Sequence, residues 1–212
     1  MELWIYVSNK IYQANNVFQP KINKKNKEKM KLISHRVNTI DQLKDTNTNF
    51  GIEVDIRSSN GNLIIQHDPF LSGEIFSDWI KEFRHGTLIL NVKEEGLETE
   101  LLKYMKKYNI DDFFFLDQSF PFLIKTISSG ESRCALRVSE FESIETAKSL
   151  SKKIDWIWVD CFTKFPLLNE SFRALKDLGY KICIVSPELQ GFNPKTEIKK
   201  YNELFINENI KP

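Results

Sequence analysis

Apolar and polar positions alternate with two different periods along most of the chain. From Lys31 onward, short runs rich in branched and aromatic residues alternate with longer stretches in which apolar residues recur every three or four positions. The short runs are typical of strands and the longer ones of amphipathic helices, so their alternation predicts βαβ units and a parallel sheet. The expected strands are 31–34, 51–57, 87–93, 113–117, 135–139, 156–162, 181–186 and 204–207, and the expected helices are 75–84, 98–108, 143–153, 170–178 and 196–201.

The number of expected strands narrows the α/β class to one architecture. Eight strands favour a compact (β/α)8 TIM-type barrel over an open doubly wound sheet, although such barrels typically need about 250 residues. We expect residues 31–212 to form this domain. Residues 1–30 open with a short apolar run and continue as a polar, lysine-rich run without a clear period. We interpret them as an N-terminal extension, which need not be ordered.

Side-chain parity in the second expected strand predicts a charged row inside the barrel. In 51–57 the apolar residues share one face, whereas Glu53, Asp55 and Arg57 share the other. Helices pack outside the strands, so the apolar face points outward and the charged row points inward. Burying two carboxylates without compensation is very costly. A bound metal ion is the simplest compensation, and an internal ion pair with Arg36, Arg57 or Lys93 is the alternative.

Four short strings with chemical content follow one another in the first half of the expected barrel. They are Ile33-Ser34-His35-Arg36, Glu53-Val54-Asp55, Gly61-Asn62-Leu63-Ile64-Ile65-Gln66-His67-Asp68-Pro69 and Leu90-Asn91-Val92-Lys93. In order and spacing, the His-Arg, Glu-x-Asp and His-Asp-Pro elements resemble the glycerophosphodiester phosphodiesterase family. That family belongs to the wider group of barrel phosphodiesterases that includes phosphatidylinositol-specific phospholipase C.

The resemblance implies a role for each matching residue. Glu53 and Asp55 would bind a divalent cation, Mg²⁺ or Ca²⁺, and His35 and His67 would be the general acid and base, in an order that the sequence leaves open. Arg36 and Lys93 would hold the phosphate oxygens, an ion pair of Lys93 with Asp55 being the alternative. Later strand ends surround the active site of a barrel. They add four residues that we expect to contact substrate: Asp117, Arg137, Asp160 and Glu188.

Two positions depart from the family pattern. Val37 stands where the family has glycine after His-Arg, and Asn91 stands where the family has a third metal-binding glutamate. An amide oxygen can coordinate a hard cation but brings no negative charge. We therefore predict that Asn91 completes the metal site with Glu53 and Asp55.

These elements predict the hydrolysis of a small, soluble, glycerophosphodiester-like substrate. A metal ion and basic groups would stabilise the phosphate charge, while two histidines would move protons near neutral pH. Two alternatives stay open. One is a phospholipase C-like lyase that stops at a cyclic phosphate. The other is a phosphate-sugar binding module with reduced catalysis, which the departures at Asn91 and Val37 support.

Composition and charge narrow the class of partner. The net charge is +1 and the lysines are mostly scattered, which is unlike a nucleic-acid-binding surface. No run reaches the about 18 apolar residues that a membrane span requires, so we expect no membrane insertion. The three cysteines (Cys134, Cys161 and Cys183) lie in apolar runs, as reduced thiols do. These features predict a cytoplasmic protein, and they leave its oligomeric state open.

Overall fold

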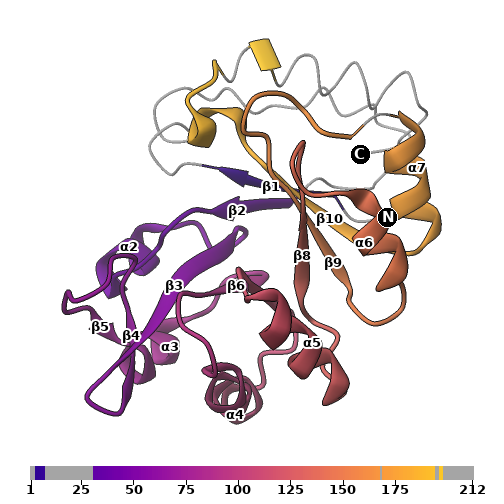
Figure 1. The fold of residues 1–212 in the computed structure, drawn as a ribbon. Helices are drawn as coiled ribbons and strands as arrows, with labels where there is room; N and C mark the ends of the chain where they lie inside the picture. The colour runs from indigo at the N-terminus through magenta and orange to yellow at the C-terminus, as the bar shows by residue number, and fades with distance from the viewer. Residues whose placement is uncertain (1–2, 8–30, 168, 194–195, 198–212) are drawn as a thin grey trace. The chain divides into compact units, whose positions relative to one another are not determined.

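The computed structural model describes residues 3–7, 31–167, 169–193 and 196–197. Its internal contacts divide the chain into two compact units. Unit 1 comprises residues 1–32 and 136–212, and unit 2 comprises residues 33–135. Each unit combines parallel strands with helices, so the chain has a mixed α/β fold, as the alternating pattern predicts (Figure 1).

Unit 2 is organised around one long strand, β3 (Gly51–Ser59). Parallel partners of β3 are β2 (Lys31–Ser34), which pairs through Ile33 and Ser34, and β6 (Leu88–Val92). Strand β7 (Phe113–Leu116) is parallel to β6 on its other side. In the β3–β6 register Asp55 lies opposite Asn91. This register places Asp55 and Asn91, two of the predicted site residues, side by side on adjacent strands.

An antiparallel extension of β3 carries the chain to His67. Residues Asn60 and Gly61, with φ of 49° and 78°, connect β3 to β4 (Asn62–Ile65). Two consecutive left-handed residues with the sequence Asn-Gly form the tight turn that matches strand twist. Strand β4 then pairs with the short β5 (Glu74–Ile75). The His-Asp-Pro element lies between β4 and β5.

Four helices accompany the strands of unit 2: α2 (Ile40–Asp45), α3 (Phe76–Glu82), α4 (Glu98–Tyr108) and α5 (Phe120–Ser128). Helix α2 begins with a capping box, in which Thr39 accepts a hydrogen bond from the Gln42 backbone and the Gln42 side chain accepts one from the Thr39 backbone. Trp79 of α3 is fully buried. The apolar outward faces of the strands and these helix faces form the core of the unit.

Unit 1 contains the remaining strands, in the order β1 (Leu3–Val7), β10 (Lys181–Val185), β9 (Trp156–Val159) and β8 (Ala135–Val138). Strand β10 is parallel to both β1 and β9. Its helices are α6 (Ile144–Ser149), α7 (Asn169–Asp177) and the 3-10 helix η1 (Pro187–Gln190). Cys161 and Cys183 are buried in this unit and Cys134 is buried in unit 2, all three as free thiols.

The structure corrects one expectation near the N-terminus. Residues 3–7, which we assigned to an extension, form β1, paired from Leu3–Ile182 to Tyr6–Val185. A fully apolar run with a buried partner strand needs no alternation, so its periodicity gave no signal. Residues 8–30, the expected strand 204–207 and most of the expected helix 196–201 lie outside the described residues. Among the helices described, none combines the length and apolar character of a membrane span.

Candidate functional site

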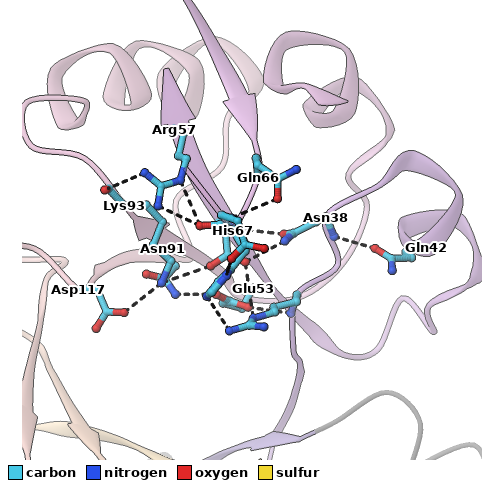
Figure 2. Close-up of polar contacts among 12 residues, drawn as sticks. Asn38, Gln42, Glu53, Arg57, Gln66, His67, Asn91, Lys93 and Asp117 are labelled. Atoms are coloured by element: carbon cyan, nitrogen blue, oxygen red, sulfur yellow. Dashed lines mark hydrogen bonds and ion pairs between the residues drawn. The ribbon is translucent and has the colours of Figure 1, made fainter. Parts of the chain in front are cut away.

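Unit 2 brings together most of the residues that the sequence predicts for the site. Each lies in a strand or directly after one: β2 ends before His35, β3 carries two carboxylates, and β4 leads to His67. The parallel strands β2, β3 and β6 run in one direction, so their carboxyl ends lie along one edge of the sheet. The antiparallel β4 brings the chain back along β3 to His67. The predicted residues of this unit are His35, Arg36, Glu53, Asp55, His67, Asn91, Lys93 and Asp117 (Figure 2 shows most of them).

Glu53 is completely buried, and both of its carboxylate oxygens accept hydrogen bonds. The Arg36 backbone N–H donates to Oε2 over 2.7 Å. The Asn91 side-chain amide donates through Nδ2 to Oε1 over 2.8 Å (Figure 2). These two bonds hold the carboxylate in one orientation between the end of β2 and strand β6.

Asp55 is equally buried, and Asn38 holds it with a pair of hydrogen bonds. The Asn38 amide donates to Asp55 Oδ2 over 2.8 Å, and the Asp55 backbone N–H donates to Asn38 Oδ1 over 3.1 Å (Figure 2). Two cations lie further away, Lys93 Nζ at 3.4 Å from Oδ1 and Arg36 Nε at 3.8 Å from Oδ2. Asn38 was not predicted for the site, because its contact depends on the loop after β2 folding back over β3.

Two buried oxygen atoms at the centre of the site accept no hydrogen bond from the residues described: Asp55 Oδ1 and Asn91 Oδ1. Lys93 Nζ lies 3.4 Å from Asp55 Oδ1, but the two groups are not aligned for a hydrogen bond. The Asn91 side-chain amide cannot be flipped, because its oxygen would then face the Glu53 carboxylate. Asp55 and Asn91 are partners in the strand register.

Such oxygens fit a hard divalent cation, which prefers carboxylate and amide oxygen ligands. Among the residues that the structure describes, no group of three or more histidine, cysteine, aspartate or glutamate side chains is placed to hold a metal ion. The donor set that fits therefore consists of two carboxylates, Glu53 and Asp55, and one amide, Asn91. Its formal charge of −2 would balance one divalent ion.

His67 is held at both ring nitrogens. Arg36 Nη2 lies 2.6 Å from Nε2, and Asp68 Oδ1 lies 2.7 Å from Nδ1. A guanidinium only donates, so Nε2 accepts and Nδ1 carries the proton that is donated to Asp68. In this arrangement Nε2 faces Arg36, and Asp68 orients the ring through Nδ1. Asp68 directly follows His67 in the chain, so the His-Asp-Pro string itself indicates this orienting contact.

His35 lies in an environment that disfavours its charged form. Burial, followed by the positive charge of Arg36, lowers the pKa of His35 to about 4, and the nearby Asp55 opposes this shift only in part. The ring is therefore neutral at neutral pH. A neutral imidazole can accept a proton, and it does not add a positive charge beside the cations of the site.

Arg36 and Lys93 are basic side chains that both lie within 4 Å of the Asp55 carboxylate. The Arg36 side chain is 47% exposed, and its backbone has a φ of 51°. Lys93 Nζ lies between Asp55 Oδ1 at 3.4 Å and Asp117 Oδ2 at 3.3 Å. Asp117 also has a left-handed backbone, with a φ of 59°. Left-handed non-glycine residues are costly and cluster at functional sites.

Three residues expected to contact substrate lie in unit 1. Arg137 Nε is 3.8 Å from Asp160 Oδ2, and Gln190 donates to Asp160 Oδ1 over 2.6 Å. Burial raises the pKa of Asp160, and Arg137 opposes that shift. Glu188 accepts a hydrogen bond from the Ser186 hydroxyl. The contact of Arg137, Asp160 and Glu188 with substrate stays a prediction.

Comparisons with known proteins give matches only at the level of three-dimensional structure. No family model and no curated protein matches the chain. A glycerophosphodiester phosphodiesterase from Agrobacterium tumefaciens str. C58 is similar to it at 15% identity with a TM-score of 0.49, covering 73% of this chain and 84% of that one. A glycerophosphoryl diester phosphodiesterase from Parabacteroides distasonis ATCC 8503 is similar at 12% identity with a TM-score of 0.42, covering 80% and 86%. Both of these solved structures are of glycerophosphodiester phosphodiesterases, the family that the motifs of this chain resemble.

Proposed function

We propose that the chain is a divalent-metal-dependent phosphodiesterase on a (β/α)8-type barrel, and that it hydrolyses a small, soluble, glycerophosphodiester-like substrate. One observation carries the proposal: two buried carboxylates and the buried Asn91 amide, which together leave two oxygens unsatisfied, lie among two histidines and two basic side chains. Phosphodiester cleavage can use all of these groups, because the phosphate is anionic, the attacking hydroxyl must lose a proton and the leaving oxygen must gain one.

Glu53, Asp55 and Asn91 would hold the metal ion, either Mg²⁺ or Ca²⁺. When bound there, the cation would supply charge stabilisation to a phosphate oxygen. Arg36, which is half-exposed, and Lys93 would bind the other phosphate oxygens. A phosphate that takes Arg36 would draw its guanidinium away from His67 Nε2, because both acceptors compete for the same N–H groups.

The environments of the two histidines favour different roles. His35 is the proposed general base, because its lowered pKa keeps it unprotonated at neutral pH, ready to accept a proton from the attacking hydroxyl. His67 is the proposed general acid. Asp68 holds the ring through Nδ1, so that Nε2 would be the atom that gives a proton to the leaving oxygen.

Activity with and without metal tests this proposal. Purified protein should release nitrophenolate from bis(4-nitrophenyl) phosphate in the presence of Mg²⁺ or Ca²⁺, and excess chelator should abolish the release. Glu53→Gln and Asp55→Asn should lower kcat/KM by about 10²-fold or more, because each removes a charge that the metal needs. Full activity in chelator would contradict the proposal. Phosphate binding without turnover would instead support a binding module.

A cyclising reaction uses the same groups and differs in the nucleophile. If the substrate carries a hydroxyl beside the phosphate, His35 would take its proton and a five-membered cyclic phosphate would form. If water attacks, the product is a phosphomonoester. Phosphorus NMR of the products from a glycerophosphodiester distinguishes the two, because cyclic and acyclic esters have different chemical shifts.

A further inference from the structure

Arg57 is a half-buried residue of β3 that shares the inward parity of Glu53 and Asp55 but does not bind either of them in the contacts described. The backbone ladder around it ends at two points. Gln66 N–H donates to the Asp55 carbonyl and Lys93 N–H donates to the Ile56 carbonyl, each over 2.9 Å. Beyond these two backbone bonds, His67 after β4 and Lys93 after β6 are bonded to a side chain of β3.

The Arg57 guanidinium holds both strand ends through their carbonyl groups. Its Nε and Nη2 donate to the His67 carbonyl over 3.1 and 2.9 Å, and its Nη1 donates to the Lys93 carbonyl over 3.4 Å (Figure 2). His67 and Lys93 come from different strands, and both belong to the proposed site. One planar side chain therefore fixes the backbone of the two residues relative to each other.

The charge of Arg57 is balanced outside the metal site. Glu94 Oε1 lies 3.6 Å from Arg57 Nη1, and Glu94 Oε2 accepts hydrogen bonds from the Ser58 backbone N–H and hydroxyl over 3.1 and 2.6 Å. Because Glu94 already balances the positive charge of Arg57, the guanidinium needs no ion pair with Glu53 or Asp55. Its directional N–H groups are free to serve the two carbonyls.

We propose that Arg57 is a positioning residue for the reaction, which holds the His67 imidazole and the Lys93 ammonium in register at the phosphate. This role rests on the proposed function. The fork of N–H groups is essential, since a lysine ammonium carries the charge but cannot align donors to two carbonyls at once. Misplacing catalytic groups by about 1 Å can cost about 10²-fold in rate.

The kinetic test compares two variants of Arg57 with a neighbour. On an alkyl glycerophosphodiester, whose leaving oxygen needs a proton, and with saturating metal, Arg57→Gln should lose about 10²-fold in kcat/KM, mainly in kcat. Arg57→Lys should keep about tenfold more activity than Arg57→Gln, because it still donates to one carbonyl. Ser58→Ala is the matched control, since it weakens the hold on Glu94 and leaves Arg57 in place; it should stay within about twofold of the unaltered protein.

A spectroscopic test separates this role from the proposed activity. In protein with ¹³C-labelled histidine, the three imidazole signals can be assigned with His→Gln variants. Arg57→Gln should shift or split the His67 signal and leave that of His85 unchanged. A protein without turnover would overturn the proposed function, yet a displaced His67 signal would still support positioning. Unchanged kcat/KM and an unchanged His67 signal in Arg57→Gln would overturn the inference. If Arg57→Gln does not fold, Arg57→Lys decides by the same two measurements.

Discussion

At the scale of single residues, the site was predictable where chemistry follows strand parity. Glu53, Asp55 and Asn91 alternate with apolar neighbours, so their inward direction could be read from the sequence, and the register confirms that Asp55 faces Asn91. Asn38, Asp68 and Arg57 act through hydrogen bonds to backbone or to neighbouring side chains. The contacts of Asn38 and Arg57 depend on where the chain returns to the sheet, and no pattern in the sequence encodes that distance, whereas Asp68 directly follows His67 in the chain.

Asn91 allows a sharp test of the metal site, because aspartate has the same shape. Asn91→Asp would add a charge at the unsatisfied oxygen and remove the donor to Glu53 Oε1. Without metal, the unfolding free energy should fall by about 1–3 kcal/mol, the cost of an unpaired buried group. With metal, affinity should rise about tenfold, or about 1.4 kcal/mol. Urea unfolding and calorimetric titration with Ca²⁺ and Mg²⁺ measure the two effects.

The control for this substitution is Asn91→Ala, which loses the same donor without adding charge. It should be less stable and bind metal more weakly. Equal metal affinities in the original chain, Asn91→Asp and Asn91→Ala would mean that this residue does not contact the ion.

The assigned roles of the two histidines predict different responses to the leaving group. His67→Ala should lose about 10²-fold or more on an alkyl phosphodiester, in line with general acid catalysis. It should recover much of that loss on a nitrophenyl ester, whose leaving oxygen needs little protonation. His35→Ala should be equally impaired on both substrates. Single-turnover rates on the two esters measure this difference, and a recovery by His35→Ala would reverse the assignment.

At the scale of elements, the strands that enclose the site were the most predictable and the loops the least. The expected strand 31–34 and helix 98–108 are confirmed residue for residue by β2 and α4. Strand β4 and helices α2 and α5 were not among the expected elements. Helix α2 has six residues with one buried among them. A helix this short shows too little of the 3.6-residue period to be distinguished, and only its capping box marks it.

The loop between β4 and β5 depends on one glycine that the backbone requires. A Cβ on Gly73 would lie 2.1 Å from the Ile65 carbonyl oxygen and 2.8 Å from its carbon. Gly73→Ala should therefore destabilise the protein by about 1–3 kcal/mol, the usual cost of overpacking, and displace the segment that carries His67. Gly61→Asn is the control, because nothing lies within 4 Å of that position and asparagine tolerates its φ of 78°. Thermal unfolding should show a lower Tm only for Gly73→Ala.

At the scale of the whole molecule, alternation of strands and helices predicted the α/β class, and each unit has that character. The extension expected at the N-terminus was wrong for β1, whose partner β10 lies near the other end of the chain. Pairing between segments so far apart in sequence leaves no local period to recognise. Burial of polar groups has a similarly global consequence, because it changes how folding depends on pH.

The stability of the folded chain should fall as the pH is lowered, and His35 should account for much of the fall. Its folded pKa is about 4, below its ordinary value of 6.5, and burial also lowers the pKa of His85. Between these values the unfolded chain binds more protons, so the unfolding free energy rises with pH in that window and is lost as pH falls toward 4. For His35 the full effect is on the order of 3 kcal/mol.

Urea unfolding in chelator from pH 7 to 5, above the range of most carboxylates, isolates the histidines. The slope should be smaller in His35→Gln, while groups such as Asp160, whose pKa is raised, contribute equally to both proteins. Identical slopes would show that His35 is not held neutral in the folded state, and its assignment as general base would then have to be given up.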